Sequence, residues 1–283
     1  MQLKQAVDAA YELFVAHDVP SPRLNAELLV MFVLGRERAY FYAHPERELT
    51  EEEEFHYDQV IHERARGVPT QYITGHQEFW GLDLLVSPAV LIPRPETEHV
   101  VETVLELVKQ MLPVAHLKLI DVGTGSGAIA LALASELPRA EIHACDISDD
   151  ALEMARVNAA RLGLEQRVSY RKSDLLAAYA GEQFDLVVSN PPYVGESEVD
   201  KVQRQVREFE PKIAVFSGEE GMDIYRRLIP QANEALNPGG RLVVEIGFST
   251  EQSVRELLEG WADIQATPDL QGIPRVIAAK RPL

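Results

Sequence analysis

Residues 1–75 carry apolar side chains at the spacing of amphipathic helices. The first set recurs every three or four residues and therefore shares one helix face: Leu3, Ala6, Val7, Ala10, Leu13 and Phe14. A second helix is expected to begin at Ser21-Pro22 and stop at Gly35, and a third to run from Thr50 to about Gly67. Short helices with short connections predict a small helical bundle in this region.

Between residues 76 and 92 the pattern changes to that of short strands. Phe79-Trp80-Gly81-Leu82 and Leu84-Leu85-Val86 predict two strands around a tight turn. We interpret residues 76–92 as a β-hairpin linker between two domains. A helix is then expected from Pro95 to about Leu112.

Beyond residue 116, apolar runs typical of buried strands alternate with helical patterns. Strands are expected at 117–122, 141–147, 168–171, 184–189, 241–246 and 273–280, and helices at 128–136, 149–162 and 222–236. Such alternation predicts a mostly parallel sheet covered on both faces. The chain is therefore expected to be α/β, with a Rossmann-like doubly wound domain over residues 93–283 that follows the helical bundle.

Composition and charge narrow the class of protein. The 283 residues are 46% apolar, enough for an ordinary core, and carry a formal net charge of −18. Contacts with phosphates need a surplus of Lys and Arg, so direct binding of nucleic acid is not expected. The apolar runs are shorter than the roughly eighteen residues of a membrane span, and the N-terminus lacks a signal-peptide core. A cytoplasmic protein without membrane contact is expected.

Two features that suggest ligands have simpler interpretations. The acidic run Glu51–Glu54 follows Thr50, and Thr50 with Glu53 has capping-box spacing, so the run is interpreted as a first helical turn. The eight histidines show no metal-binding spacing, and no metal site is expected. Cys145, the single cysteine, is expected to be a small buried hydrophobic residue.

A glycine-rich loop follows the first expected strand of the sheet. It reads Asp121-Val122-Gly123-Thr124-Gly125-Ser126-Gly127-Ala128. Alternating glycines between a strand and a helix permit a sharp turn and close approach of a ligand, so Gly123, Thr124, Gly125, Ser126 and Gly127 are candidate cofactor residues. The loop also fits the dinucleotide pattern G-x-G-x-x-A, and a turn without a ligand is a further alternative.

Two later strand ends extend the candidate cofactor site. Asp146 ends the second strand, where a carboxylate accepts hydrogen bonds from ribose hydroxyls of either a nicotinamide or an adenosylmethionine cofactor. The alternative is a helix cap, because Ser148 and Asp149 crowd the same turn. Asp174 closes the third strand at a place where an adenine amino group is read, and Leu175 is expected to pack on the base.

The motif Asn190-Pro191-Pro192-Tyr193, which ends the fourth strand, indicates the chemistry. The prolines stiffen this turn, which suits it to aim groups at a reacting atom. The Asn190 side-chain oxygen and the Pro191 carbonyl can each accept one N–H of an amide or aromatic amine, and Tyr193 can stack on the planar group. The motif predicts methyl transfer from S-adenosylmethionine to a planar nitrogen. A nicotinamide-dependent oxidoreductase would leave the motif without a role, and a plain surface turn is the remaining alternative.

The chain resembles the HemK/PrmC family of release factor glutamine methyltransferases over essentially its full length. The stretches that carry the resemblance are Gln71–Gly75, Glu78–Leu82, Val90–Glu98, Asp121–Gly127, Asn190–Tyr193, Glu210-Pro211, Gly221–Tyr225 and Pro238–Gly240. Val90–Glu98 is the most distinctive of them. Its Arg94 is expected either to orient the linker near the active site or to pair with Glu96 or Glu98.

The resemblance implies a cofactor, a substrate and site residues. Gly123–Gly127, Asp146 and Asn190 would contact S-adenosylmethionine, and Asn190–Tyr193 would hold the substrate glutamine. That glutamine would belong to the Gly-Gly-Gln loop of a class I peptide release factor, and the N-terminal helices would bind another part of the factor. Leu175 departs from the family, which often has an aromatic residue there. The alternative is an enzyme that methylates exocyclic amines of DNA or RNA bases with the same motif.

Overall fold

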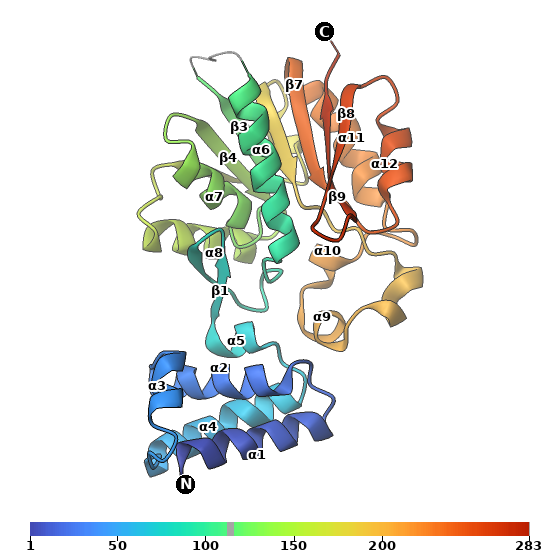
Figure 1. Cartoon of the computed structure of the whole chain (residues 1–283). Helices are drawn as coiled ribbons and strands as arrows, with labels where there is room; N and C mark the ends of the chain where they lie inside the picture. Colours follow the sequence, from blue (N-terminus) through green and yellow to red (C-terminus); the bar gives the residue numbers. More distant parts are fainter. Residues whose placement is uncertain (112–115, 283) are drawn as a thin grey trace. The chain divides into compact units, whose positions relative to one another are not determined.

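Helices followed by alternating strands and helices make up the computed structural model, which describes residues 1–111 and 116–282 (Figure 1). Leu112, where one helix was expected to end, lies outside these residues. The chain forms two compact units, residues 1–76 with 203–209 and residues 77–202 with 210–283.

A seven-stranded sheet forms the centre of the second unit, in the order β5-β4-β3-β6-β7-β9-β8. Its strands are β3 Lys118–Val122, β4 Glu141–Asp146, β5 Val168–Lys172, β6 Phe184–Ser189, β7 Leu236–Glu245, β8 Ala262–Pro268 and β9 Pro274–Lys280. Neighbours from β5 to β7 are parallel, whereas β9 is antiparallel to both β7 and β8. The expected Rossmann-like, mostly parallel sheet is confirmed.

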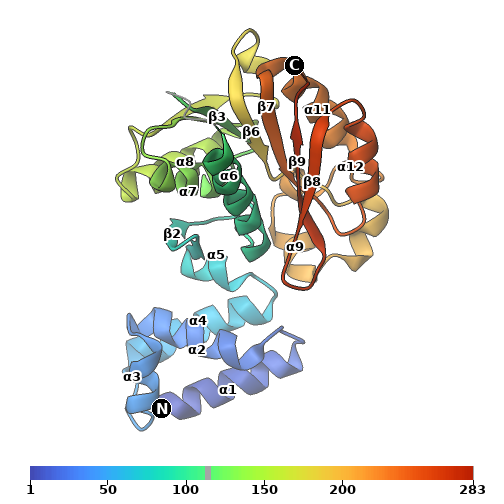
Figure 2. The ribbon, with the colours of Figure 1, turned by 45° about the horizontal axis from the view of Figure 1, so that its top comes forward.

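Helices cover both faces of this sheet (Figure 2). One core contains side chains of α6 (Glu98–Gln110), α7 (Ala128–Glu136) and α8 (Asp149–Arg161), and the other contains side chains of α11 (Asp223–Ala235) and α12 (Glu251–Leu257). Successive residues of a strand point to opposite faces, so Leu119 enters the first core and Ile120 the second. Both faces of the central strands are buried, which explains why their sequences are mostly apolar rather than alternating.

The remaining elements of this unit are short. A separate hairpin pairs β1 (His76–Phe79) with β2 (Leu82–Leu85), and Trp80 and Gly81 between them take positive φ angles of 54° and 71°. The other short elements are η1 Pro95–Thr97, η2 Ala177–Tyr179, η3 Glu196–Lys201 and α10 Lys212–Val215. Among the residues that the structure describes, no helix combines the length and apolarity needed to cross a membrane.

Two strands differ from the sequence pattern. β7 begins at Leu236 rather than near Arg241, because it continues through Pro238 and two glycines before its apolar part. β8 was not predicted, since most of its side chains are exposed or half-buried and it pairs with β9 alone. Such a polar edge strand has no apolar alternation to reveal it.

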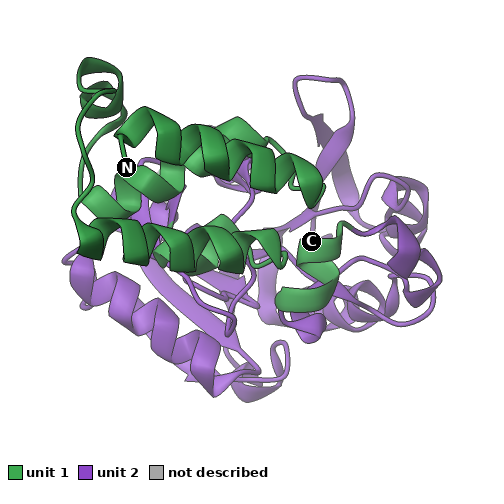
Figure 3. Ribbon diagram, turned by 90° about the horizontal axis from the view of Figure 1, so that it is seen from below, with its two compact units in different colours: residues 1–76, 203–209 green, residues 77–202, 210–283 purple. Residues whose placement is uncertain are grey.

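The first unit is a helical bundle, to which residues 203–209 also belong (Figure 3). Its helices are α1 Leu3–Ala16, α2 Pro22–Leu34, α3 Arg38–Ala43, α4 Glu51–Ala65, α5 Thr70–Thr74 and α9 Arg204–Phe209. The core joins the expected face of α1 to apolar residues of α2 and α4. The buried Tyr57 hydroxyl donates to the Ala26 carbonyl at 2.9 Å, so this core also satisfies its polar group.

The two helix starts that the sequence suggested differ in their capping. Thr50 and Glu53 form the reciprocal capping box before α4, as expected. Ser21 precedes Pro22 at the start of α2, but its φ of 49° is left-handed and its side chain makes no capping hydrogen bond. Pro22 therefore supplies the start of α2 through its fixed φ.

A buried arginine ties residues 203–209 into the first unit. Arg64 is 3% exposed, and its guanidinium donates to Asn25 Oδ1, the Val68 carbonyl and Gln205 Oε1, each at 3.0 Å. Burial lowers the pKa of Arg64. The three acceptors satisfy the buried cation and fix this segment to α4.

Candidate active site

A cavity of about 560 Å³ opens at the carboxyl ends of β3, β4 and β6. Strands β3, β4 and β5 extend the sheet in one direction, and β6 resumes it on the other side of β3. Such a switch point is where ligands of doubly wound sheets bind. The expected site residues that line the cavity are Gly123, Thr124, Gly125, Ser126, Asp146, Asp174, Leu175, Asn190, Pro191 and Pro192. Gly127 and Tyr193 are not part of its lining.

The glycines of the loop fall into two kinds. Gly123 and Gly125 have φ angles of 75° and 55°, and a Cβ on either would meet no atom within 4 Å. They therefore face open space in the cavity, where a ligand can approach the backbone closely. Gly127 instead packs α7 against α8, because its Cβ would lie 3.0 Å from Leu131 Cδ1 and 3.2 Å from the Ala155 Cβ. This loop fits a nucleoside cofactor.

Asp146 joins the end of β4 to the glycine loop. Its Oδ2 accepts the Gly125 N–H at 2.9 Å, and its Oδ1 accepts the Ser148 N–H at 3.0 Å. Burial raises the pKa of this carboxyl, and the backbone N–H groups oppose that rise. The capping of α8 falls to Ser148, whose hydroxyl accepts the Ala151 N–H at 3.2 Å. Asp146 is thus free of the capping role and faces the cavity.

Asp174 and Leu175 lie on the cavity wall beside a cation. The Asp174 carboxylate accepts from the Arg227 guanidinium at 2.6 Å, and Arg227 also lines the cavity. Leu175 has a left-handed φ of 51°, and its carbonyl accepts the Cys145 thiol at 3.3 Å. The pairing of Asp174 with Arg227 was not predicted. Reading of adenine by Asp174 stays a prediction.

The turn after β6 is held from several sides. Asn190 Nδ2 donates to Thr97 Oγ1 at 3.0 Å, and the Tyr193 hydroxyl donates to Glu245 Oε1 at 3.2 Å. Gly221 approaches the turn so closely that a Cβ on it would lie 2.2 Å from the Tyr193 carbonyl oxygen. Asn190, Pro191 and Pro192 face the cavity while the Tyr193 hydroxyl is engaged behind it. Stacking of Tyr193 on a substrate stays a prediction.

Two buried carboxyls near the cavity were not singled out from the sequence. Burial raises the pKa of Glu245 to about 7, although hydrogen bonds from Thr97 and Tyr193 lower it. Burial likewise raises the pKa of Asp121 to about 7, opposed by the Thr124 hydroxyl, which donates to Oδ2 at 2.7 Å. Asp121 stands in the glycine-loop motif and was quoted with it. Glu245 lies in a mostly apolar strand sequence, and an acidic residue at such a position was the only feature of the sequence that could have marked it as a site residue.

Arg94 pairs with neither Glu96 nor Glu98 but with Glu210. The Glu210 carboxylate is fully buried, and it accepts both the Arg94 guanidinium and the Ile92 N–H, the latter at 3.1 Å. This pair fastens the distinctive Val90–Glu98 stretch to the residue before Pro211. Since Pro93 and Pro211 both line the cavity, Arg94 helps to fix its wall.

The remaining candidate groups do not assemble a second reactive centre. Within residues 1–111 and 116–282, no three His, Cys, Asp or Glu side chains are placed to hold a metal ion. Cys145 is buried, as expected, and burial raises the pKa of its thiol. His143 is 9% exposed and accompanies Tyr179 and Phe184 in edge-to-face contacts, so it packs rather than lies at the surface.

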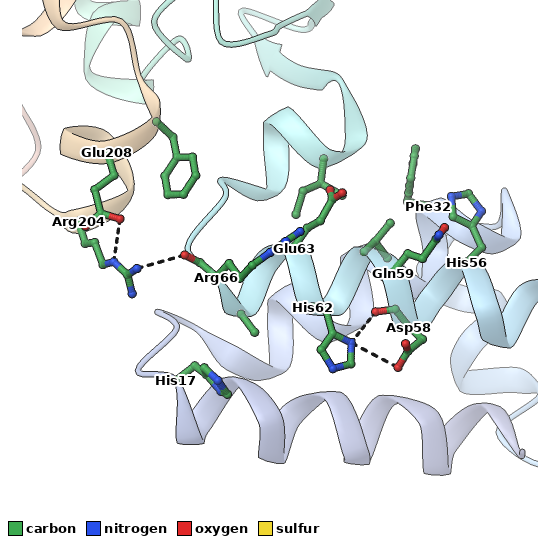
Figure 4. A pocket seen from close by; sticks show the side chains of 14 residues that line it. His17, Phe32, His56, Asp58, Gln59, His62, Glu63, Arg66, Arg204 and Glu208 are labelled. Carbon is green, nitrogen blue, oxygen red and sulfur yellow. Dashed lines mark hydrogen bonds and ion pairs between the residues drawn. The ribbon is translucent and has the colours of Figure 1, made fainter.

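A larger hollow of about 1150 Å³ belongs to the first unit (Figure 4). His17, His56 and His62 are among the residues that line it, together with Phe32 and Arg66. The His62 ring is held by the Asp58 carbonyl at 2.8 Å. His62 also pairs with the Asp58 carboxylate at 3.3 Å, and both side chains are exposed, so this pair lies at the protein surface.

Comparison with known proteins defines the class. A family model described as "Methyltransferase small domain" matches residues 100–209, and one described as "PrmC N-terminal domain" matches residues 5–75. The fold is shared with a methyltransferase from Pyrococcus furiosus, at 18% identity and a TM-score of 0.52 over 72% of this chain and 90% of that one. It is also shared with a Thermus thermophilus 16S rRNA methyltransferase in complex with AdoMet, at 18% identity and a TM-score of 0.51 over 73% and 49% of the two chains. The fold, the cavity and these matches define an S-adenosylmethionine-dependent methyltransferase.

Full-length relatives define the family. A release factor glutamine methyltransferase of Koribacter versatilis is 56% identical over 100% of this chain and 99% of its own length. The enzyme of the same name from Escherichia coli is 42% identical over 90% of this chain and 91% of its own length. The chain belongs to the release factor glutamine methyltransferase family. This membership selects S-adenosylmethionine over the nicotinamide alternative that the glycine loop and Asp146 left open.

Proposed function

We propose that this protein transfers a methyl group from S-adenosylmethionine to the side-chain amide nitrogen of a glutamine, in the Gly-Gly-Gln loop of class I peptide release factors. The observation that carries the proposal is the position of Asn190 and Pro191. Both line the cavity that the glycine loop and Asp146 also line. A planar amide held at this turn would therefore face the cofactor site.

The residues of the turn supply orientation and charge stabilisation. The Asn190 side-chain oxygen and the Pro191 carbonyl each accept one N–H of the substrate amide, which directs the nitrogen toward the methyl donor. Bound S-adenosylmethionine supplies the activated methyl group. As positive charge develops on the nitrogen, the same two oxygens stabilise it as fixed dipoles. The proton then leaves a cationic nitrogen, so no general base has to act before methyl transfer.

The glycine loop and Asp146 are proposed to hold the cofactor. Gly123 and Gly125 leave open space beside their backbone, and Asp146 lines the same cavity, with its Oδ2 accepting the Gly125 N–H at 2.9 Å. The carboxylate is suited to accept hydrogen bonds from ribose hydroxyls. Asp174 and Leu175 are proposed to contact the adenine.

The negative net charge of the protein disfavours a nucleic acid as its substrate. The net charge of −18 opposes the approach of a polyanion, whereas a folded protein partner faces no such general repulsion. We therefore propose that the chain does not act on DNA or RNA bases. This is the point on which it would differ from enzymes that share the Asn-Pro-Pro-Tyr motif.

The helical unit is proposed to bind a second part of the release factor. Its hollow is lined by aromatic, histidine and arginine side chains (Figure 4). Reversing the charge of Arg66, an exposed residue on its wall, should raise the KM for the release factor and leave the affinity for S-adenosylmethionine unchanged. Arg139→Glu, an exposed arginine in the other unit, is the matched control. Equal changes in both variants would remove the hollow from the proposal.

The reaction is tested by methyl transfer from labelled S-adenosylmethionine to a purified bacterial class I release factor. A variant factor with Gly-Gly-Ala in place of Gly-Gly-Gln, bulk DNA and ribosomal RNA are assayed beside it. Label on the intact factor alone is expected. Label on nucleic acid, or equal label on the Gly-Gly-Ala factor, would keep the methyltransferase and overturn the glutamine assignment.

A further inference from the structure

Thr97 lies between two polar side chains that come from distant parts of the second unit. Its hydroxyl donates to Glu245 Oε2 at 2.6 Å and accepts from Asn190 Nδ2 at 3.0 Å. Thr97 is 3% and Glu245 2% exposed. Both side chains are therefore shielded from bulk water: Thr97 lines the cavity together with Asn190, and Glu245 lies behind them.

The chemistry of these groups fixes the direction of each hydrogen bond. An ionised carboxylate can only accept, so it takes the single hydroxyl proton of Thr97. The Thr97 oxygen is then left as an acceptor, and the Asn190 atom that faces it has to be the NH₂ group. The Asn190 oxygen must consequently point away from Thr97.

The direction matters because an asparagine amide has two nearly isosteric ends. With its oxygen outward, Asn190 presents an acceptor to the N–H of a bound amide. With the amide turned over, Asn190 would present N–H to N–H, and neither group would have a partner. A buried donor without an acceptor is costly, so the turned amide would bind a substrate amide poorly.

The other oxygen of Glu245 holds the far end of the same turn. Oε1 accepts the Tyr193 hydroxyl at 3.2 Å, while the Tyr225 hydroxyl donates to the Glu245 backbone carbonyl at 2.7 Å. The Glu245 carboxylate thus holds both ends of the Asn190–Tyr193 turn. It is linked to Asn190 through Thr97 and directly to Tyr193.

We propose that Thr97 and Glu245 are positioning residues that set the orientation of the Asn190 amide, so that its oxygen and not its nitrogen meets the substrate amide. The inference rests on the proposed role of Asn190 in the methyl transfer. Neither Thr97 nor Glu245 touches the reacting atoms in this scheme. They act through Asn190 and Tyr193.

The test compares Thr97→Val, which keeps the shape of the side chain, with Thr97→Ser, which keeps the hydroxyl. The matched control is Thr103→Val, on the following helix, where a buried threonine hydroxyl meets Thr267 Oγ1 instead of the site. For each variant we would measure kcat and KM with a purified bacterial release factor, Kd for S-adenosylmethionine by calorimetry, and the free energy of unfolding in urea.

Thr97→Val should lower kcat at least about tenfold, or about 1.4 kcal/mol, with a change in cofactor Kd of less than about twofold. Thr97→Ser should recover most of that loss, and Thr103→Val should stay near the wild type. Wild-type kcat in Thr97→Val would overturn the proposal, as would equal losses in Thr97→Val, Thr97→Ser and Thr103→Val. Asn190→Ala distinguishes failure of this inference from failure of the proposed function. Full activity in that variant would exclude the proposed role of Asn190 itself.

A pH profile supplies a readout that simple packing would not change. The groups that act on Glu245 are Thr97, Tyr193, Tyr225, Arg275 and Glu96. Burial raises the pKa of Glu245 to about 7, which brings its ionisation near neutral pH. Once protonated, Glu245 can donate to Thr97, and the enforced direction is lost. kcat should therefore fall as the pH drops through about 7. In Glu245→Gln, which cannot ionise, this step should vanish; a profile identical to that of the wild type would overturn the part assigned to Glu245.

Discussion

The side-chain amide of Asn158 on α8 forms hydrogen bonds with both the backbone N–H and the backbone carbonyl of Leu85 in the hairpin. The Leu85 N–H donates to Asn158 Oδ1 at 2.7 Å, and Asn158 Nδ2 donates to the Leu85 carbonyl at 2.9 Å. The second N–H of the same amide donates to the Ser126 carbonyl in the glycine loop at 2.9 Å. One fully buried side chain thus fixes the hairpin and the loop together.

Asn158→Ala should destabilise the protein and weaken its cofactor binding. The change removes the side-chain partner of the buried Ser126 carbonyl and of both half-buried backbone groups of Leu85, which should lower the free energy of unfolding by about 2–4 kcal/mol. Urea denaturation with and without S-adenosylmethionine measures both effects. Asn237→Ala is the matched control, since its half-buried amide donates to Asp185 far from the loop. A loss no greater than that of the control would mean that the Asn158 contacts are dispensable.

Gly127→Ala should mainly lower the stability of the protein, whereas Gly123→Ala should mainly lower its affinity for S-adenosylmethionine. At Gly127 the added methyl meets Leu131 and Ala155, so overpacking and the positive φ should together lower stability by about 2–4 kcal/mol. At Gly123 the methyl enters open space, so stability should fall by only about 1–2 kcal/mol and S-adenosylmethionine affinity should fall most. Thermal unfolding and calorimetric titration of both variants check the contrast. Equal affinity losses would contradict it.

The pair of Arg94 and Glu210 should show strong coupling. Arg94→Met removes the guanidinium from the buried Glu210 carboxylate, which keeps its hydrogen bond from the Ile92 N–H. The free energy of unfolding should therefore fall by about 2 kcal/mol or more. The double variant with Glu210→Gln removes the unpaired charge and should be more stable than Arg94→Met alone. Additive losses in a urea-denaturation cycle would show that the pair does not act as a unit.

Stability should decrease with rising pH through the ionisation of Glu245. The pKa of Glu245 is about 7 in the folded protein and about 4.5 in the unfolded chain. Between these pH values Glu245 is therefore protonated in the folded protein but ionised in the unfolded chain. This contribution is fully present below about pH 4.5 and is lost as the pH rises through about 7, in total about 3 kcal/mol. The difference in unfolding free energy between wild type and Glu245→Gln should change by that order across this window. A constant difference would exclude a shifted pKa.

Long, strongly patterned elements could be predicted from the sequence. The buried strands around Ile120 and Val187 are mostly apolar, and the glycine loop and Asn190–Tyr193 directly follow these two strands. Because the carboxyl ends of parallel strands meet at one edge, these motifs could be expected to converge before any coordinates were known. Their roles toward ligands stay predictions.

The contacts that organise the site could not be predicted in the same way. Thr97 and Glu245 are 148 residues apart, and Arg94 and Glu210 are 116 apart. No local pattern indicates such a pairing. For Arg94 the sequence therefore left two alternatives, orientation of the linker or pairing with Glu96 or Glu98, and Glu210 was not among the partners considered. Ser21 shows the same limit at short range, because its left-handed backbone follows from the geometry of the connection before α2 rather than from its capping propensity.

Residues 203–209 belong with the helical bundle although the chain on either side of them belongs with the sheet. The polypeptide therefore passes from one unit to the other at 76–77, at 202–203 and again at 209–210. Neither unit is a single continuous length of sequence. A chimera that exchanged only residues 1–76 with a relative would set the foreign bundle against the host's α9, and Arg64 would meet a Gln205 that had not been exchanged with it. The exchangeable module is a pair of segments, and during synthesis the bundle remains incomplete until residue 209 has been added.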